Sequence, residues 1–165
     1  MTDEGRVELT IPSKLQYLPV VSVCVFEFCQ RTPELSGSEK AVYDVQLAVQ
    51  EAATNIIEHA YGGRTDGRVE FVFRSHGSCL EIEIGDRGRG FDFDSVPPPS
   101  LSEPHEGGYG VFLIKSLVDE VYYRSDPVAG NCLRLVKRFS EPGEQSLPRS
   151  AGEVKCDGFE DSNCG

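Results

Sequence analysis

The chain is poor in basic residues: its 165 residues hold 16 lysines and arginines against 27 aspartates and glutamates, a formal net charge of -11. So acidic a protein repels polyanions, which argues against nucleic acid or an anionic membrane as its main partner. The sequence also lacks a run of about 18 apolar residues. It has no basic-then-apolar signal at Met1 either, so neither a membrane span nor a secretory leader is expected. These absences predict a cytoplasmic protein.

Cysteine pairs of the C-x-x-C type are missing as well. None of the six cysteines has this spacing, which disfavours both a zinc site and a thioredoxin-like redox site. In the cytosol we expect reduced thiols, most of them acting as small buried apolar groups. Cys156 and Cys164 are accordingly not predicted to form a metal site or a disulfide.

The hydrophobic pattern predicts an α+β fold. Apolar residues alternate at strand spacing in 7–11, 69–74, 79–84, 121–125 and 131–139, and recur at helical spacing in 13–30, in 36–62 and in 107–121. A capping box at Ser36 and Glu39 marks the start of the second helix, and Ser75 to Ser78 form a hairpin turn. The resulting order β-α-α-β-β-loop-α-β-β predicts a two-layer α/β sandwich, a mostly antiparallel sheet with helices on one face.

The C-terminal 25 residues differ in composition from the rest. Residues 141–165 hold six acids and two bases with few large apolar side chains. Such a segment buries too little apolar surface to offset the entropy of folding. We therefore predict one domain over 1–140 and a disordered acidic tail over 141–165.

Polar residues recur on the second predicted helix. Glu51, Asn55 and His59 are four positions apart, which stacks them on one face of an α-helix. A solvated helix face is the simplest explanation of such a row. Two glycine clusters further along the chain favour a functional explanation instead.

The first cluster follows a carboxylate at the end of an apolar strand. Asp86 comes directly after the alternation of the strand 79–84, where an unpaired buried charge would be unfavourable. Gly88 and Gly90 let the backbone turn sharply and leave room for a flat ligand. Downstream, the cluster at Gly107, Gly108 and Gly110 opens a helix, whose free N–H groups suit phosphate.

The ordered set of motifs resembles the GHKL (Bergerat-fold) ATPases. The stretch "EAATN" (51–55) is similar to their N box, "DRGRG" (86–90) to their G1 box and "GGYG" (107–110) to their G2 box. Within that superfamily, residues 7 to 138 most resemble the bacterial anti-sigma-factor serine/threonine kinases of the RsbW type. The continuations "IIEHAY" and "GVFLIKSLVDEV" and the compact length are part of this similarity.

The resemblance implies a site for ATP and Mg²⁺. Asn55 would hold Mg²⁺, and Glu51 would act as the catalytic base that accepts the proton of the attacking hydroxyl. Asp86 would accept a hydrogen bond from the adenine amino group. The other implied nucleotide-binding residues are Gly88, Gly90, Gly107, Gly108, Gly110 and His59, with the ATP lid over 91–107. For His59 a packing role is an equal alternative, and Lys115 is expected to be solvated rather than bound to phosphate.

The resemblance also implies partners and two alternative functions. As a kinase, the protein would phosphorylate a STAS-type anti-sigma-factor antagonist and sequester a sigma factor, as a homodimer without direct nucleic-acid or membrane contact. Kinases of this type carry an arginine early in the first helix, but here Val20 or a neighbour occupies that place. Loss of such a cation can slow phosphoryl transfer roughly 10³-fold. The alternative is therefore a nucleotide-gated binding module with little kinase activity.

Overall fold

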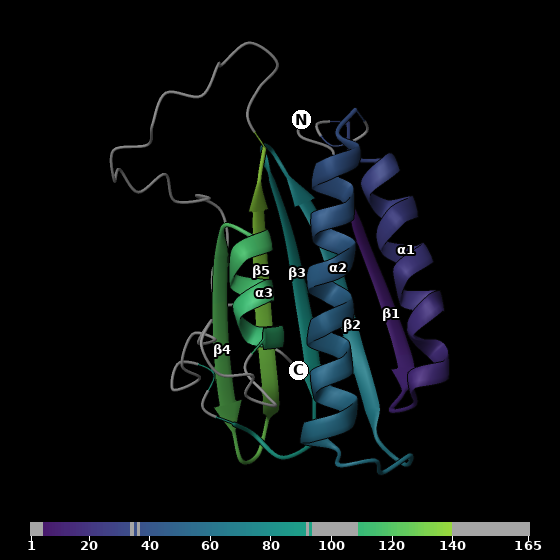
Figure 1. Cartoon of the computed structure of the whole chain (residues 1–165), viewed down its shortest axis with the longest axis vertical. Helices are drawn as coiled ribbons and strands as arrows, with labels where there is room; N and C mark the ends of the chain where they lie inside the picture. The colour runs from purple at the N-terminus through teal and green to yellow at the C-terminus, as the bar shows by residue number, and fades with distance from the viewer. Residues whose placement is uncertain (1–4, 34, 36, 92, 94–108, 140–165) are drawn as a thin grey trace.

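The computed structural model describes residues 5–33, 35, 37–91, 93 and 109–139. Five antiparallel strands form one sheet in the order β1-β2-β3-β5-β4. The helices α1, α2 and α3 cover one face of this sheet (Figure 1). The elements are β1 (Arg6–Pro12), a 3₁₀ turn (Leu15–Tyr17), α1 (Leu18–Gln30), α2 (Glu39–Asn55), a π-helical turn η2 (Ile56–Ala60), β2 (Arg68–His76), β3 (Cys79–Asp86), α3 (Tyr109–Leu117), β4 (Glu120–Asp126) and β5 (Gly130–Arg138).

The predicted two-layer α+β sandwich is confirmed. Side chains that alternate along the central strands point toward the helices and are almost fully buried, as for Phe71 and Phe73 on β2 and Ile84 on β3. On the helix side, Val45 and Val49 of α2 are equally buried. The apolar layer between sheet and helices therefore fixes α2 across the middle of the sheet, where its second half carries the predicted polar row.

Two boundaries differ from the sequence prediction. The cap of α2 is Ser38, whose Oγ accepts a hydrogen bond from the backbone N–H of Ala41 at 3.3 Å. The predicted cap Ser36 lies outside the described residues. The hairpin between β2 and β3 also turns over two residues rather than four, because Gly77 adopts a φ of +52° and lets both strands run further.

The sheet face opposite the helices, called the open face below, is charged. On it Arg74 of β2 forms ion pairs with Glu83 at 2.8 Å and with Glu81 at 3.3 Å, both on β3. Val72 of β2, which is directly opposite Glu83, is an apolar residue on the same face. In the described part of the chain, no helix is long and apolar enough to cross a membrane.

The cysteines only partly follow the expectation of reduced thiols. Cys24 and Cys29 are free, and burial raises the pKa of the Cys29 thiol to about 12. Cys79 and Cys132, in contrast, are disulfide-bonded. The prediction of reduced thiols is thus wrong for these two strand residues, since spacing along the sequence carries no information on which cysteines the fold brings together.

Candidate functional site

The last turns of α2 carry the first half of the site. Glu51 and Asn55 lie one helical turn apart and are both half-buried. The opposite side of the same helix segment, with Val49, Ala52 and Ala53, is buried in the core. Because this apolar side is packed on the sheet, the carboxylate and the amide are held in fixed positions at the edge of the core.

His59 lies beyond α2, on a different kind of helical turn. After Asn55 the helix changes to the π turn η2, in which the backbone N–H of Tyr61 donates to the carbonyl of Ile56 at 2.9 Å. The structure places His59 on this turn and exposed, whereas Glu51 and Asn55 are half-buried.

Asp86 is the last residue of β3 and is 7% exposed. Its Oδ1 accepts two hydrogen bonds of 2.8 Å, from the backbone N–H of Gly88 and from Nδ2 of Asn131. Burial raises the pKa of the Asp86 carboxyl above the usual aspartate value, and these two hydrogen bonds oppose the rise. Within the described residues Oδ2 accepts no hydrogen bond, so it is available to a ligand donor.

The two glycines after Asp86 are required by close packing. A Cβ on Gly88 would lie 2.7 Å from the backbone carbonyl carbon and oxygen of Ala60, and one on Gly90 would lie 2.3 Å from Oγ of Ser125. The backbone N–H of Arg89 also donates to the Ala60 carbonyl at 2.8 Å. The loop after β3 is therefore clamped between the end of the π turn and the β4–β5 hairpin.

The start of α3 contacts the polar residues of α2 directly. A Cβ on Gly110 would lie 3.0 Å from Nδ2 and 3.2 Å from Oδ1 of Asn55, and 3.4 Å from Oε2 of Glu51. A side chain at position 110 would thus fill the space beside the amide and the carboxylate. Gly107 and Gly108, and the predicted lid except for Phe91 and Phe93, lie outside the described residues.

Three segments far apart in sequence therefore meet at one end of α2. The loop after β3 packs on Ala60, and the first turn of α3 packs on Asn55 and Glu51. Among the described residues, this arrangement leaves one carboxylate oxygen of Asp86 without a hydrogen-bond donor at one side and the Asn55 amide beside Gly110 at the other. Such a pair suits a ligand with a hydrogen-bond donor at one end and anionic oxygens at the other.

A magnesium ion fits this donor set. Among the described residues, no group of three or more His, Cys, Asp or Glu side chains is placed to hold a metal ion. Mg²⁺ needs no such group, because it commonly takes one or two protein ligands and completes its shell with phosphates and water. Asn55 Oδ1, with the glycine backbone at position 110 leaving space beside it, meets that requirement.

Asn131 and Tyr61 belong to the site but were missed in the sequence. Asn131 on β5 donates to Asp86 and to the Gly88 carbonyl at 3.0 Å, and its Oδ1 accepts from Ser125 Oγ at 2.7 Å. The Tyr61 hydroxyl accepts from the backbone N–H of Arg87 at 3.0 Å. A polar residue in an otherwise apolar inward position was the available signal for Asn131, whereas nothing in the sequence pointed to Tyr61.

Few cations approach the site from the described residues. Nζ of Lys115 on α3 lies 5.0 Å from the centroid of the Phe93 ring, a cation–π contact. Val20, which with its neighbours occupies the stretch of α1 where an arginine was expected, is 49% exposed. The described part of α1 therefore supplies no positive charge, as its sequence indicated.

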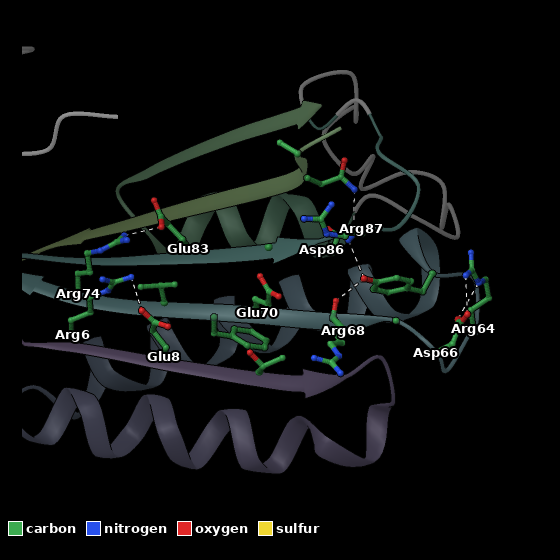
Figure 2. Close-up of a pocket in the computed structure, with 18 residues that line it drawn as sticks. Arg6, Glu8, Arg64, Asp66, Arg68, Glu70, Arg74, Glu83, Asp86 and Arg87 are labelled. Atoms are coloured by element: carbon green, nitrogen blue, oxygen red, sulfur yellow. Dashed lines mark hydrogen bonds and ion pairs between the residues drawn. The ribbon is translucent and has the colours of Figure 1, made fainter. Parts of the chain in front are cut away.

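A groove of about 640 Å³ lies on the open face, and one of its ends reaches the back of the site. Figure 2 shows that side chains of both signs line it, from Arg6 and Glu8 at one end to Arg87 at the other. Asp86 and Asn131 border its far end. Glu51 and Asn55 do not line it, so the groove is a separate feature of the opposite side of the sheet.

Comparison with known proteins gives consistent matches over most of the chain. A family model described as a histidine kinase-like ATPase domain matches residues 11–137. The serine-protein kinase RsbW of Oceanobacillus iheyensis is 30% identical over 129 residues, which cover 73% of this chain and 80% of that protein. RsbW of Halalkalibacterium halodurans is 34% identical over 128 residues (73% and 76%), and RsbW of Listeria innocua is 30% identical over 132 residues (74% and 82%).

Proposed function

Because the chain belongs to the histidine kinase-like ATPase family, in the group of the RsbW serine-protein kinases, we propose that it is a Mg-ATP-dependent serine/threonine protein kinase. Its substrate would be a STAS-type anti-sigma-factor antagonist. The protein would act in the cytoplasm as an anti-sigma factor or partner-switching regulator, as a homodimer that also binds a sigma factor. Its net charge of -11 supports a protein partner rather than nucleic acid or membrane.

The observation that carries this proposal is the convergence of the three motifs on one end of α2. Gly110 lies against Asn55 and Glu51, while Gly88 lies against Ala60 one turn further on. A solvated helix face would have no reason to be approached so closely by two glycine loops. The same glycines would allow a nucleotide to lie against the backbone.

Each residue has a distinct role in the proposed reaction. Asp86 Oδ2 would accept the adenine amino group, while Asn131 and Gly88 hold the carboxylate in place through Oδ1. Gly90 would leave room for the base, and the Gly110 backbone would lie along the phosphates, together with Gly107 and Gly108. His59 is exposed and would at most approach the phosphate end.

At the other end of the nucleotide, Asn55 would hold Mg²⁺, which supplies charge neutralisation to the phosphates. Glu51, one turn away, would take the proton from the serine hydroxyl as that oxygen attacks the terminal phosphorus. The half-buried position of Glu51 keeps this carboxylate within reach of a docked side chain.

A nucleotide-gated binding module is the second candidate. It is favoured by the sequence of α1, which has no lysine or arginine, so that Val20 or a neighbour stands where the expected arginine would be. Phosphoryl transfer without a transition-state cation is slowed by roughly 10³-fold in well-studied systems. In that case ATP would only select between protein partners.

One experiment separates these functions. The protein is mixed with radiolabelled Mg-ATP and antagonist proteins encoded near it, and phosphate transfer is compared with ATP affinity measured by calorimetry. Glu51→Gln keeps the side-chain shape but removes its basicity, so it should bind Mg-ATP normally and transfer phosphate about 10²–10⁴-fold more slowly. Asn55→Ala should weaken Mg-ATP binding and transfer together.

Glu58→Gln is the matched control, because Glu58 is an exposed glutamate on the same helix end. It should leave both quantities unchanged. Transfer at the wild-type rate by Glu51→Gln would exclude the base role. ATP binding without transfer to any antagonist, in wild type and variants alike, would favour the binding module.

A further inference from the structure

The side of β5 that faces the helices is apolar in its middle and polar at both ends. This inward row begins with Asn131, which holds Asp86, and ends with Lys137. Lys137 is directly opposite the fully buried Leu80 of β3, and directly paired residues point to the same side of a sheet. Lys137 therefore lies under the helix layer, where a charge needs partners, and it belongs to none of the three motifs.

The partners of Lys137 come from two helices. Its Nζ donates to the backbone carbonyl of Leu117, the last residue of α3, at 2.8 Å. The same Nζ lies 3.8 Å from Oδ2 of Asp44 on α2, and the two side chains are 19% and 11% exposed. A lysine is favourable at the C-terminal end of a helix, because the last carbonyls carry partial negative charge. Lys137 thus connects the end of α3 to α2.

This connection bears on where α3 lies along α2. The two helices run side by side in opposite directions, with the first turn of α3 at Asn55 and its last residue tied through Lys137 to Asp44 (Figure 1). Val111 and Ile114 bury one side of α3 in the core. Apolar contacts are non-directional, so they fix which side of a helix is buried better than its position along its axis. A charge-assisted hydrogen bond has a defined length and direction and can fix that position.

We propose that Lys137 is a positioning residue for the phosphate end of the nucleotide site, an inference that rests on the proposed function. It holds the Leu117 carbonyl and thereby sets how far α3 extends along α2. At the other end of this nine-residue helix, Gly110 lies against Asn55 and Glu51. A shift of α3 by one residue would move Gly110 by about 1.5 Å relative to the proposed magnesium ligand and base. Lys137 itself touches neither and acts through α3.

The C-terminal end of α3 is suited to be its anchor. Beside the bond from Lys137, the backbone N–H of Asp119 donates to the Val136 carbonyl at 2.9 Å. At the other end, Gly110 meets the Asn55 amide by packing, without a side chain of its own. A nine-residue helix is too short to be stable in isolation, so its placement depends on such tertiary contacts.

A second lysine offers a matched control. Nζ of Lys40 lies 2.6 Å from the same oxygen of Asp44, but Lys40 is four residues earlier on α2 and its side chain is 85% exposed. Exposed ion pairs of this kind contribute little to stability. Lys40→Met removes a positive charge beside Asp44, as Lys137→Met does, and leaves the bond to the end of α3 in place.

Comparing ligands with and without phosphates tests the proposal. Adenosine would use the Asp86 end of the site, whereas Mg-ATP would also use Asn55 and the Gly110 backbone. Lys137→Met should raise the dissociation constant for Mg-ATP, measured by calorimetry, by roughly 2- to 30-fold, the range for residues that act on a site through an intervening element. The dissociation constant for adenosine should not change. Lys40→Met should change neither.

Hydrogen exchange in the nucleotide-free protein measures the hold on α3 directly. The amides of 109–117 should exchange faster in Lys137→Met than in the wild type or in Lys40→Met, because the end of the helix is released. If Lys137→Met does not fold, Lys137→Gln provides the same comparison. Its neutral amide ends one bond earlier than the lysine and should give the same selective loss of Mg-ATP affinity.

Three outcomes would overturn the proposal. An unchanged affinity for Mg-ATP would show that the bond to Leu117 does not affect the site. Equal losses for Mg-ATP and adenosine would mean that Lys137 acts through the whole fold, and an equal loss in Lys40→Met would assign the effect to the charge around Asp44. A wild type that binds no Mg-ATP would instead overturn the proposed function, and exchange over 109–117 would then still decide whether Lys137 holds α3.

Discussion

Replacing Asp86 by asparagine should weaken ATP binding without weakening the fold. The Asp86 carboxylate accepts hydrogen bonds from Gly88 and Asn131 through one oxygen and leaves the other available. An asparagine that keeps its oxygen toward these donors presents an NH₂ group where the free oxygen was. In the proposed complex, this donor would meet the amino group of adenine, which is also a donor.

The size of the effect follows from the bond that is lost. A hydrogen bond to a charged acceptor contributes about 1.5–3 kcal/mol. That corresponds to a dissociation constant for ATP roughly 10- to 150-fold higher. Discrimination between ATP and a nucleotide whose base lacks this amino group should fall by a similar factor, since the lost bond is the one that recognises it.

The pH dependence gives an independent check. Burial raises the pKa of Asp86, so folding favours the protonated form, and this contribution to stability is lost as pH rises through the raised pKa. At neutral pH the neutral asparagine should therefore leave the melting temperature unchanged or raise it. Nucleotide binding has the opposite dependence, because it needs the carboxylate. ATP affinity of the wild type should fall as pH drops through this pKa, and that dependence should disappear in Asp86→Asn.

Calorimetric titration with Mg-ATP over a pH series, combined with thermal melting, measures both quantities. Asp66→Asn is the control, because Asp66 is exposed and, among the described residues, forms its ion pair with Arg64, at 3.0 Å. It should change neither ATP affinity nor its pH dependence. An unchanged dissociation constant in Asp86→Asn would refute the assignment of this carboxylate to adenine. A loss of affinity together with a large fall in melting temperature would mean that it acts through the fold.

Three further outcomes are expected. Gly88→Ala places a Cβ 2.7 Å from the Ala60 carbonyl, so thermal melting should show a loss of about 1–3 kcal/mol, whereas Gly37→Ala, with nothing within 4 Å, should not. Asn131→Ala removes one donor from the buried Asp86 carboxylate, the proposed acceptor for adenine, so calorimetry should show weaker ATP binding, and an unchanged affinity would exclude a positioning role. A chain cut after Ser140 should keep its melting temperature and its ATP affinity in reducing buffer, because the removed tail has few apolar residues. A large fall in either quantity would show that the tail is part of the core.

Much of the fold could be predicted from the sequence, because the patterns that predict strands and helices are local. The alternation of apolar residues in 79–84 predicted a strand, and the apolar residues at helical spacing before Asn55 predicted a helix. Each pattern is contained in a short stretch of sequence, because it records which residues of one element face the core. The order of these elements predicted a two-layer sandwich, and the ordered motifs around Glu51, Asn55 and Asp86 predicted the family. Each of these features can be recognised without knowing what lies opposite in space.

What only the tertiary structure decided depends on contacts between distant segments. The partnership of Asn131 with Asp86 follows from the register of β5 on β3, which no local pattern specifies. The π turn that begins after Asn55 and carries His59 is likewise a matter of backbone hydrogen bonding, which the periodicity of the sequence does not reveal. The open face likewise became visible only once the strands had been ordered, because residues far apart in the chain share that face through strand pairing rather than through sequence spacing.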